Sequence, residues 1–133
     1  SIDKRLGSQL LIKENAKKLG VLPKKIIESD VKQFLTNDLT SSFSDSNRVV
    51  IGGCDKDSKI IIIKAISKFL TKGDIVVLPI ITYEVLQKVS NLLKRLNYET
   101  SMNLIQTYKG LSISEGTRFE PNNPVFIIKA KKK

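Results

Sequence analysis

Carboxylates and glycines stand where three successive strands of an α/β sheet would end. Asp3 closes the first apolar segment, Asp30 follows the second, and Gly52-Gly53 follows the third. In an open parallel sheet, ligands bind beyond the carboxyl ends of the strands. A carboxylate there can accept hydrogen bonds from both hydroxyls of a ribose, and glycine lets the backbone approach a ligand closely. The pattern therefore indicates a crevice for a nucleotide-type cofactor.

The composition excludes several kinds of catalytic and structural site. The chain has 133 residues, no histidine and a single cysteine, Cys54. Histidine-based general bases and Ser-His-Asp triads are therefore excluded. One cysteine cannot form an intrachain disulfide, and without histidine it is a poor basis for a zinc site. We expect no metal centre, and we interpret Cys54 as a small buried hydrophobe rather than a nucleophile.

The charge balance is strongly basic. Lys and Arg number 23 against 13 Asp and Glu, a formal net charge of +10. Such a surplus attracts anionic partners, so nucleic acid, a polycarboxylate metabolite and simple solubility all remain open on composition alone. No apolar run approaches the roughly 20 residues that cross a bilayer, and the first residues lack a signal-peptide layout. We expect no membrane partner and a cytoplasmic location.

Hydrophobic periodicity and breaker residues predict alternating strands and helices. We expect helices at 6–19, 31–39, 57–70 and 83–96, and strands at 1–3, 25–28, 48–51, 75–78, 99–106 and 124–129. Segments 40–47 and 109–123 are predicted as loops. The alternation is typical of parallel strands with helices on both faces, and the last two strands, joined without a helix, predict an antiparallel hairpin. The fold class is therefore α/β.

The predicted architecture is similar to the class I S-adenosylmethionine-dependent methyltransferase fold, a Rossmann-like, mostly parallel sheet closed by an antiparallel hairpin. Particular segments narrow the resemblance: residues 1–3 with 11–21, residues 48–53, Gly110, Gly116-Thr117 and residues 123–128. Together they resemble the precorrin C(15)-methyltransferase (decarboxylating) family of cobalamin biosynthesis. That family often forms the C-terminal part of a bifunctional precorrin-6Y C(5,15)-methyltransferase. The resemblance covers nearly the whole chain.

One part of the family pattern has no counterpart here. The first strand and its Gly-rich loop are missing, so the resemblance implies that residues 1–133 are the C-terminal portion of a single methyltransferase domain, inactive in isolation. In this class the first strand lies between the strands that correspond to residues 1–3 and 48–51. We expect that position to be filled by another chain, by an upstream segment, or by direct pairing of 1–3 with 48–51.

The resemblance implies S-adenosyl-L-methionine as cofactor and assigns residues to it. Asp3 would hold the ribose. Asp30 and the main-chain N–H of Val31 would meet the adenine, and Gly52 would lie against the cofactor. Other interpretations stay open: Asp3 and Asp30 could each be a helix N-cap, and Gly52 could simply belong to a tight turn.

The resemblance likewise implies that Gly53, Lys109, Thr117 and Arg118 bind the substrate, an anionic tetrapyrrole whose carboxylates would meet the basic side chains. Arg can pair with a carboxylate through two hydrogen bonds, whereas Lys109 could also be an ordinary solvated lysine. No catalytic residue is assigned. Transfer of a methyl group from a sulfonium to carbon depends chiefly on proximity and alignment, so the absence of histidine is no objection.

The leading hypothesis is an S-adenosylmethionine-dependent C-methyltransferase and decarboxylase that acts on a precorrin. We expect it to be a homo-oligomer or to be fused to a second methyltransferase domain. The alternative is a non-catalytic, basic RNA-binding domain with a degenerate methyltransferase fold. The family resemblance favours a polycarboxylate over nucleic acid as the anionic partner.

Overall fold

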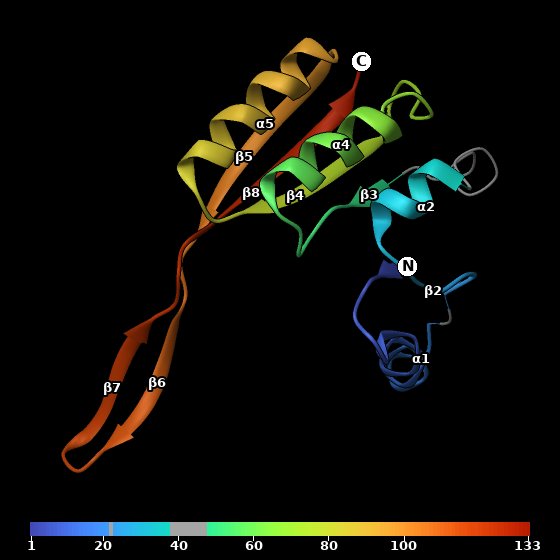
Figure 1. Cartoon of the computed structure of the whole chain (residues 1–133). Coiled ribbons are helices and arrows are strands. Elements are labelled where there is room, and N and C mark those ends of the chain that lie inside the picture. The colour runs from blue at the N-terminus through green and yellow to red at the C-terminus, as the bar shows by residue number, and fades with distance from the viewer. Residues whose placement is uncertain (22, 38–47) are drawn as a thin grey trace. The chain divides into compact units, whose positions relative to one another are not determined.

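The chain folds into two compact units, Ser1–Phe43 and Ser44–Lys133. The computed structural model describes residues 1–21, 23–37 and 48–133 (Figure 1). The loop expected at 40–47 lies outside the described residues.

The first unit is a β-α-β arrangement followed by a short helix. Its elements are β1 (Ile2–Asp3), α1 (Ser8–Leu19), β2 (Ile27–Glu28) and α2 (Val31–Asn37). β1 and β2 pair in parallel, with Ile2 opposite Ile27 and Asp3 opposite Glu28. The carboxyl ends of both strands therefore lie at the same edge, as the sequence predicted.

Helix α1 begins later than the apolar pattern indicated. Gly7 occupies the N-cap position with φ 79°, a left-handed conformation that favours glycine and prevents the helix from extending back to Leu6. Leu6 is 97% exposed, so it is not part of the buried helix face that we expected. The predicted end is confirmed, because Gly20 adopts φ 68° and the Val21 N–H donates to the Ala16 carbonyl at 3.0 Å.

The second unit contains a four-stranded mixed sheet in the order β3-β4-β8-β5. Its elements are β3 (Arg48–Val50), α4 (Lys56–Ile66), β4 (Ile75–Ile80), α5 (Tyr83–Arg95), β5 (Tyr98–Ile105), β6 (Tyr108–Ile113), β7 (Gly116–Pro121) and β8 (Val125–Lys132). β3 and β4 are parallel, whereas β8 is antiparallel to both β4 and β5. The predicted antiparallel pairing of the last two sheet strands is confirmed.

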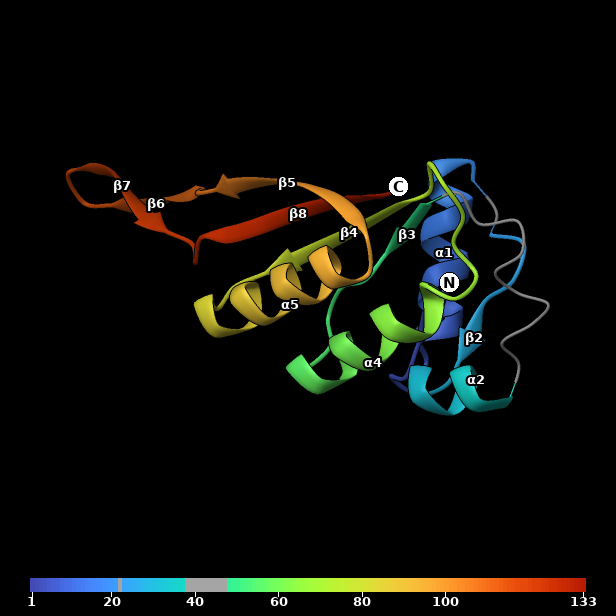
Figure 2. The same ribbon diagram turned by 90° about the horizontal axis from the view of Figure 1, so that it is seen from above.

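One face of this sheet carries the core. Figure 2 shows α4 and α5 on the same side of the sheet, so within the described part of this unit neither helix covers the other face. β4 alternates along its length, and Val76, Leu78 and Ile80 are buried. They pack beneath the helix layer, in which Ile63 and Leu93 are fully buried. Each such side chain contributes roughly 1.5–3 kcal/mol.

β3 is an edge strand among the described residues. Among the described strands it pairs with β4 alone, and Val50 is 73% exposed. Direct pairing of residues 1–3 with 48–51, one of the three alternatives for the position of the missing strand, is not among the pairings of the described strands. β1 instead makes its hydrogen bonds with the β2 segment, where the Ser29 N–H donates to the Asp3 carbonyl at 3.0 Å.

Residues 109–123, which we expected to be a loop, contain a second antiparallel hairpin. β6 and β7 pair from Tyr108↔Pro121 to Ile113↔Gly116 and extend away from the ends of β5 and β8 (Figure 1). Gly110 and Pro121 are typical of loops, but in the structure Gly110 pairs with Phe119 and Pro121 pairs with Tyr108. Almost every residue of the hairpin is exposed, so no buried apolar face marked its strands in the sequence.

Candidate functional site

Asp3 is held by a neighbouring arginine at the tip of β1. Its Oδ1 accepts the Arg5 main-chain N–H at 2.9 Å, and its Oδ2 accepts the Arg5 guanidinium at 2.6 Å. Hydrogen bonds from the Arg5 side chain, first, and from its main-chain N–H lower the pKa of Asp3 from its ordinary value of 3.8 to about 2. Asp3 is therefore ionised at neutral pH and acts only as a hydrogen-bond acceptor.

Asp3 is not the cap of helix α1, so that alternative interpretation is wrong. The N-cap is Gly7, and the carboxylate that serves the first turn comes from β2: Glu28 Oε2 accepts the Gln9 N–H at 3.2 Å. It also lies 3.4 Å from the buried Ser8 hydroxyl. Glu28 reaches α1 because parallel pairing places the ends of β1 and β2 side by side. This role was missed from the sequence, because it depends on the pairing of two strands.

Asp30 does act as a helix cap. Its Oδ1 accepts the Lys32 N–H at 2.7 Å, and its carbonyl accepts the Phe34 N–H at 3.0 Å. Val31 is the first residue of α2 and is half-buried. Because Asp3 pairs with Glu28, the structure places Asp3, Asp30 and Val31 together at the carboxyl edge of the first unit's strand pair.

In the second unit, Gly52 and Gly53 form the turn that follows β3. Gly53 has φ 65°, so this position favours glycine on conformational grounds. Gly52 is exposed, and an added Cβ would lie 3.8 Å from the Pro79 side chain, an ordinary contact. The turn leads directly into α4, where Asp55 is the N-cap and accepts the Ser58 N–H at 2.9 Å.

A buried lysine holds this turn from the side of the helix. Lys59 is only 7% exposed, and its ammonium donates to the Cys54 carbonyl. The same nitrogen lies 3.8 Å from the Cys54 sulfur. Cys54 is half-buried rather than buried as expected. The role of Lys59 was missed from the sequence, because a lysine beside four isoleucines reads as the solvated side of a helix.

The β6–β7 hairpin separates the remaining predicted residues onto two faces. Lys109 lies opposite Glu120, and Arg118 lies opposite Leu111, so alternation puts both cations on one face. Arg118 and Glu120 are 3.9 Å apart on that face. Thr117 lies on the other face, where its methyl would come within 3.2 Å of a Cβ added at Gly110.

The described residues contain no cluster of three or more His, Cys, Asp or Glu side chains that could hold a metal ion. None of their helices has the length and apolar character needed to traverse a bilayer.

Comparison with known proteins identifies the relatives of the chain. No family model matches it. Among curated proteins, it is 26% identical over 132 residues to a probable cobalt-precorrin-6B C(15)-methyltransferase (decarboxylating) of Sulfurisphaera tokodaii. The match spans 99% of this chain and 66% of that protein. The chain is therefore similar in sequence to a C(15)-methyltransferase along nearly its whole length.

Solved structures agree with the sequence match. A precorrin-6Y C5,15-methyltransferase from Geobacter metallireducens is 26% identical with a TM-score of 0.78, over 98% of this chain and 66% of that one. A precorrin-8W decarboxylase from Methanobacterium thermoautotrophicum is 20% identical with a TM-score of 0.77, over 97% and 67% of the two chains. More distant methyltransferases share the same architecture. The expected class I, Rossmann-like methyltransferase fold is thus confirmed, and the chain spans 66% of the length of its curated relative.

The Asp3–Arg5 contact makes a direct prediction about acidity. In Arg5→Ala, the pKa of Asp3 should rise from about 2 toward its ordinary value of 3.8, because the largest cause of the lowered pKa is removed. Since the folded-state pKa is the lower one, the stabilisation that Arg5 confers is present above the unfolded pKa and is lost as pH falls through the folded pKa. A carboxyl-carbon NMR titration measures both values. Arg118→Ala, which removes an arginine elsewhere, should leave Asp3 unchanged; an unaltered Asp3 pKa in Arg5→Ala would contradict the assignment.

Proposed function

We propose that this chain provides an S-adenosylmethionine-dependent C-methyltransferase and decarboxylase that acts on a precorrin in cobalamin biosynthesis. The observation that carries the proposal is the sequence match along 99% of the chain to a curated relative named for that activity. The methyltransferase fold supports it. The RNA-binding alternative is not favoured, because the relatives that match in both sequence and fold are named as precorrin enzymes.

The cofactor proposed is S-adenosyl-L-methionine, and the first unit supplies acceptors that fit its adenosine. The Asp3 carboxylate is ionised and lies at a strand tip, so it can accept from the ribose hydroxyls. Arg5 does not block this role, because its side chain is 76% exposed and can move aside at little cost. Asp30 and the Val31 N–H are proposed for the adenine, and Gly52 for the cofactor's approach to the backbone. The Asp30 carboxylate retains acceptor capacity beyond its bond to Lys32.

The proposed chemistry asks the chain for alignment rather than for acid–base groups. When bound, the cofactor supplies an electrophilic methyl whose bond to sulfur breaks, with its electron pair left on sulfur, as the substrate carbon attacks. In the decarboxylation, a substrate carboxylate leaves as carbon dioxide, and the electron pair left on carbon takes up a proton. The chain's own residues bind and orient both molecules.

The substrate proposed is an anionic tetrapyrrole held by the β6–β7 hairpin. Lys109 and Arg118 share one face, which suits two carboxylates of one ligand. Thr117 lies on the opposite face with Phe119, 70% exposed, and Tyr108, 61% exposed, and it is proposed to contact the substrate at the edge of the hairpin. Gly53 is proposed for close approach of the substrate at the β3 tip.

Three further features belong to the same proposal. We propose that the chain is the C-terminal portion of a methyltransferase domain. One edge of β3 supports this, because no described strand pairs with it and an additional strand could pair there. We also propose that the protein is a homo-oligomer or is fused to a second methyltransferase domain. A cytoplasmic location is proposed, as suits an enzyme of cofactor biosynthesis.

The direct test uses the protein expressed from its complete natural reading frame. Incubated with S-adenosylmethionine and a precorrin, it should yield a product that has gained a methyl group and lost carbon dioxide, together with S-adenosylhomocysteine. Mass spectrometry of the tetrapyrrole measures both changes. An RNA oligonucleotide supplied in place of the precorrin is the control substrate. Methyl transfer to RNA, or none to any precorrin tested, would refute the proposal.

Asp3→Ala should weaken cofactor binding in that protein. A hydrogen bond to a charged group contributes about 1.5–3 kcal/mol, equivalent to roughly 10- to 150-fold in affinity. Titration calorimetry with S-adenosylhomocysteine measures the change. Arg5→Ala is the matched control, since it removes the same ion pair but keeps the carboxylate, and it should bind as well as the unaltered protein. Equal losses in both variants would mean that Asp3 acts only by anchoring Arg5.

Charge reversal on the basic face of the hairpin should act on the substrate alone. Lys109→Glu or Arg118→Glu should raise the KM for the tetrapyrrole at least about tenfold, because each replaces an attraction to carboxylate by a repulsion. Cofactor affinity should stay unchanged. Steady-state kinetics and calorimetry separate the two effects, and Lys13→Glu on α1 controls for net charge. A hairpin without influence on the KM for the tetrapyrrole would lie outside the substrate site.

A further inference from the structure

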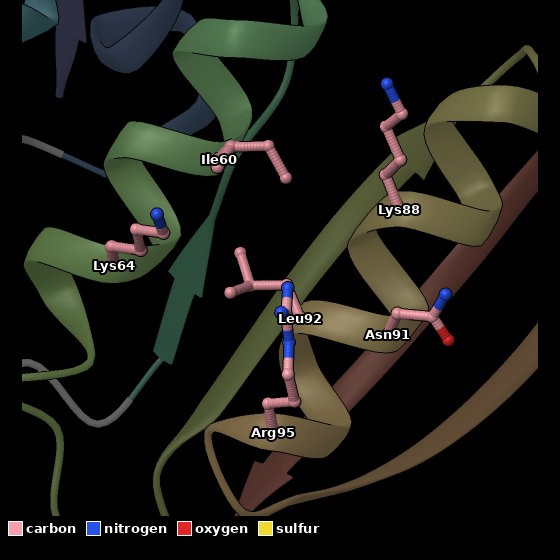
Figure 3. A pocket seen from close by; sticks show the side chains of 6 residues that line it. All are labelled: Ile60, Lys64, Lys88, Asn91, Leu92 and Arg95. Atoms are coloured by element: carbon pink, nitrogen blue, oxygen red, sulfur yellow. The ribbon is translucent and has the colours of Figure 1, made fainter.

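A basic groove runs between helices α4 and α5 of the second unit. It forms a hollow of about 270 Å³ between α4 and α5 (Figure 3). The residues that line it are Ile60, Lys64, Lys88, Asn91, Leu92 and Arg95. None of them belongs to the proposed cofactor or substrate residues, which lie at strand tips and on the hairpin.

The lining combines an apolar floor with an uncompensated basic rim. Leu92 is 4% exposed and Ile60 is half-buried, whereas Lys64, Lys88 and Arg95 are exposed. Within the described residues, the ion pairs found join Arg5 to Asp3 and Arg118 to Glu120, and none involves the three cations of the groove. Like charges that converge on one hollow repel one another, and an anion seated among them relieves that repulsion.

We propose that this groove is a docking site for an acidic segment of a partner protein. An aliphatic side chain of the segment would rest on Ile60 and Leu92, and flanking carboxylates would meet the three cations. The Asn91 amide can both donate to and accept from the backbone of the segment. Such a site would tether the protein to a partner without involving its proposed active site.

The shape and chemistry of the groove favour this occupant over two others. Single-stranded RNA is bound by basic surfaces that carry aromatic side chains for base stacking, and the groove is lined by none. A second copy of this chain would also carry a formal charge of +10, which opposes approach to a basic surface. A segment that is both acidic and aliphatic satisfies the rim and the floor together.

The test measures binding of a short fluorescein-labelled peptide in which leucine is flanked by glutamates, by fluorescence anisotropy. The combined variant Lys64→Glu, Lys88→Glu and Arg95→Glu should lose about tenfold or more in affinity, as three exposed ion pairs become repulsive. The matched control, Lys13→Glu, Lys17→Glu and Lys18→Glu on α1, changes the net charge by the same amount. Its affinity should stay within about twofold, because these lysines belong to the first unit and none of them lines the groove.

A second arm tests the apolar floor. Ile60→Ser should weaken binding of the leucine-containing peptide but not of an all-glutamate peptide. If charge reversal disturbs folding, as judged by circular dichroism, the milder combination Lys64→Gln, Lys88→Gln and Arg95→Gln serves instead. Equal losses in the groove and control variants would overturn the proposal. So would preferential binding of oligouridylate to the groove, or self-association that the groove variant abolishes.

Discussion

The position of β8 is the constraint on which the second unit depends. This last strand lies between β4 and β5 and is hydrogen-bonded to both, with Ile128 and Ala130 fully buried beneath the helices. Because β8 runs antiparallel to both neighbours, it begins at the edge of the sheet where β4 and β5 end. The chain between β5 and β8 turns at this edge of the sheet. The β6–β7 hairpin lies within this connection and carries Lys109 and Arg118 away from the sheet, beyond the end of β5 and the start of β8 (Figure 1).

At the strand tips, charged side chains bind neighbouring groups of the protein itself, in addition to any role they have in ligand binding. Asp3 fixes Arg5, Glu28 serves the first turn of α1, and Asp30 begins α2. In the second unit, Lys59 holds the Cys54 carbonyl. Each contact ties a turn to the element beside it, so the protein's own contacts fix the segments that would face a ligand. Preorganisation of this kind suits a reaction whose rate rests on alignment.

The surplus of positive charge is divided between surfaces with different surroundings. On the hairpin, Arg118 has Glu120 nearby and shares its face with Lys109. In the α4–α5 groove, three cations stand over an apolar floor without a carboxylate among the lining residues. The net charge follows from the composition alone. Whether a basic surface binds a polycarboxylate or an acidic peptide depends on the carboxylates and apolar side chains that lie among its cations.

The sequence by itself determined the class of the fold, because local patterns carry it. Apolar spacing identified α5, Gly20 marked the end of α1, and a final strand pair without a connecting helix predicted the antiparallel arrangement of β5 and β8. The same local signals identified Asp30 as a possible cap. Only the tertiary structure decided which residues face each other. Three features depend on strand pairing or packing: the β6–β7 ladder, the hydrogen bond from α1 to Glu28, and the burial of Lys59. Such contacts join residues far apart in the chain or on neighbouring elements, so they produce no periodic pattern in the sequence.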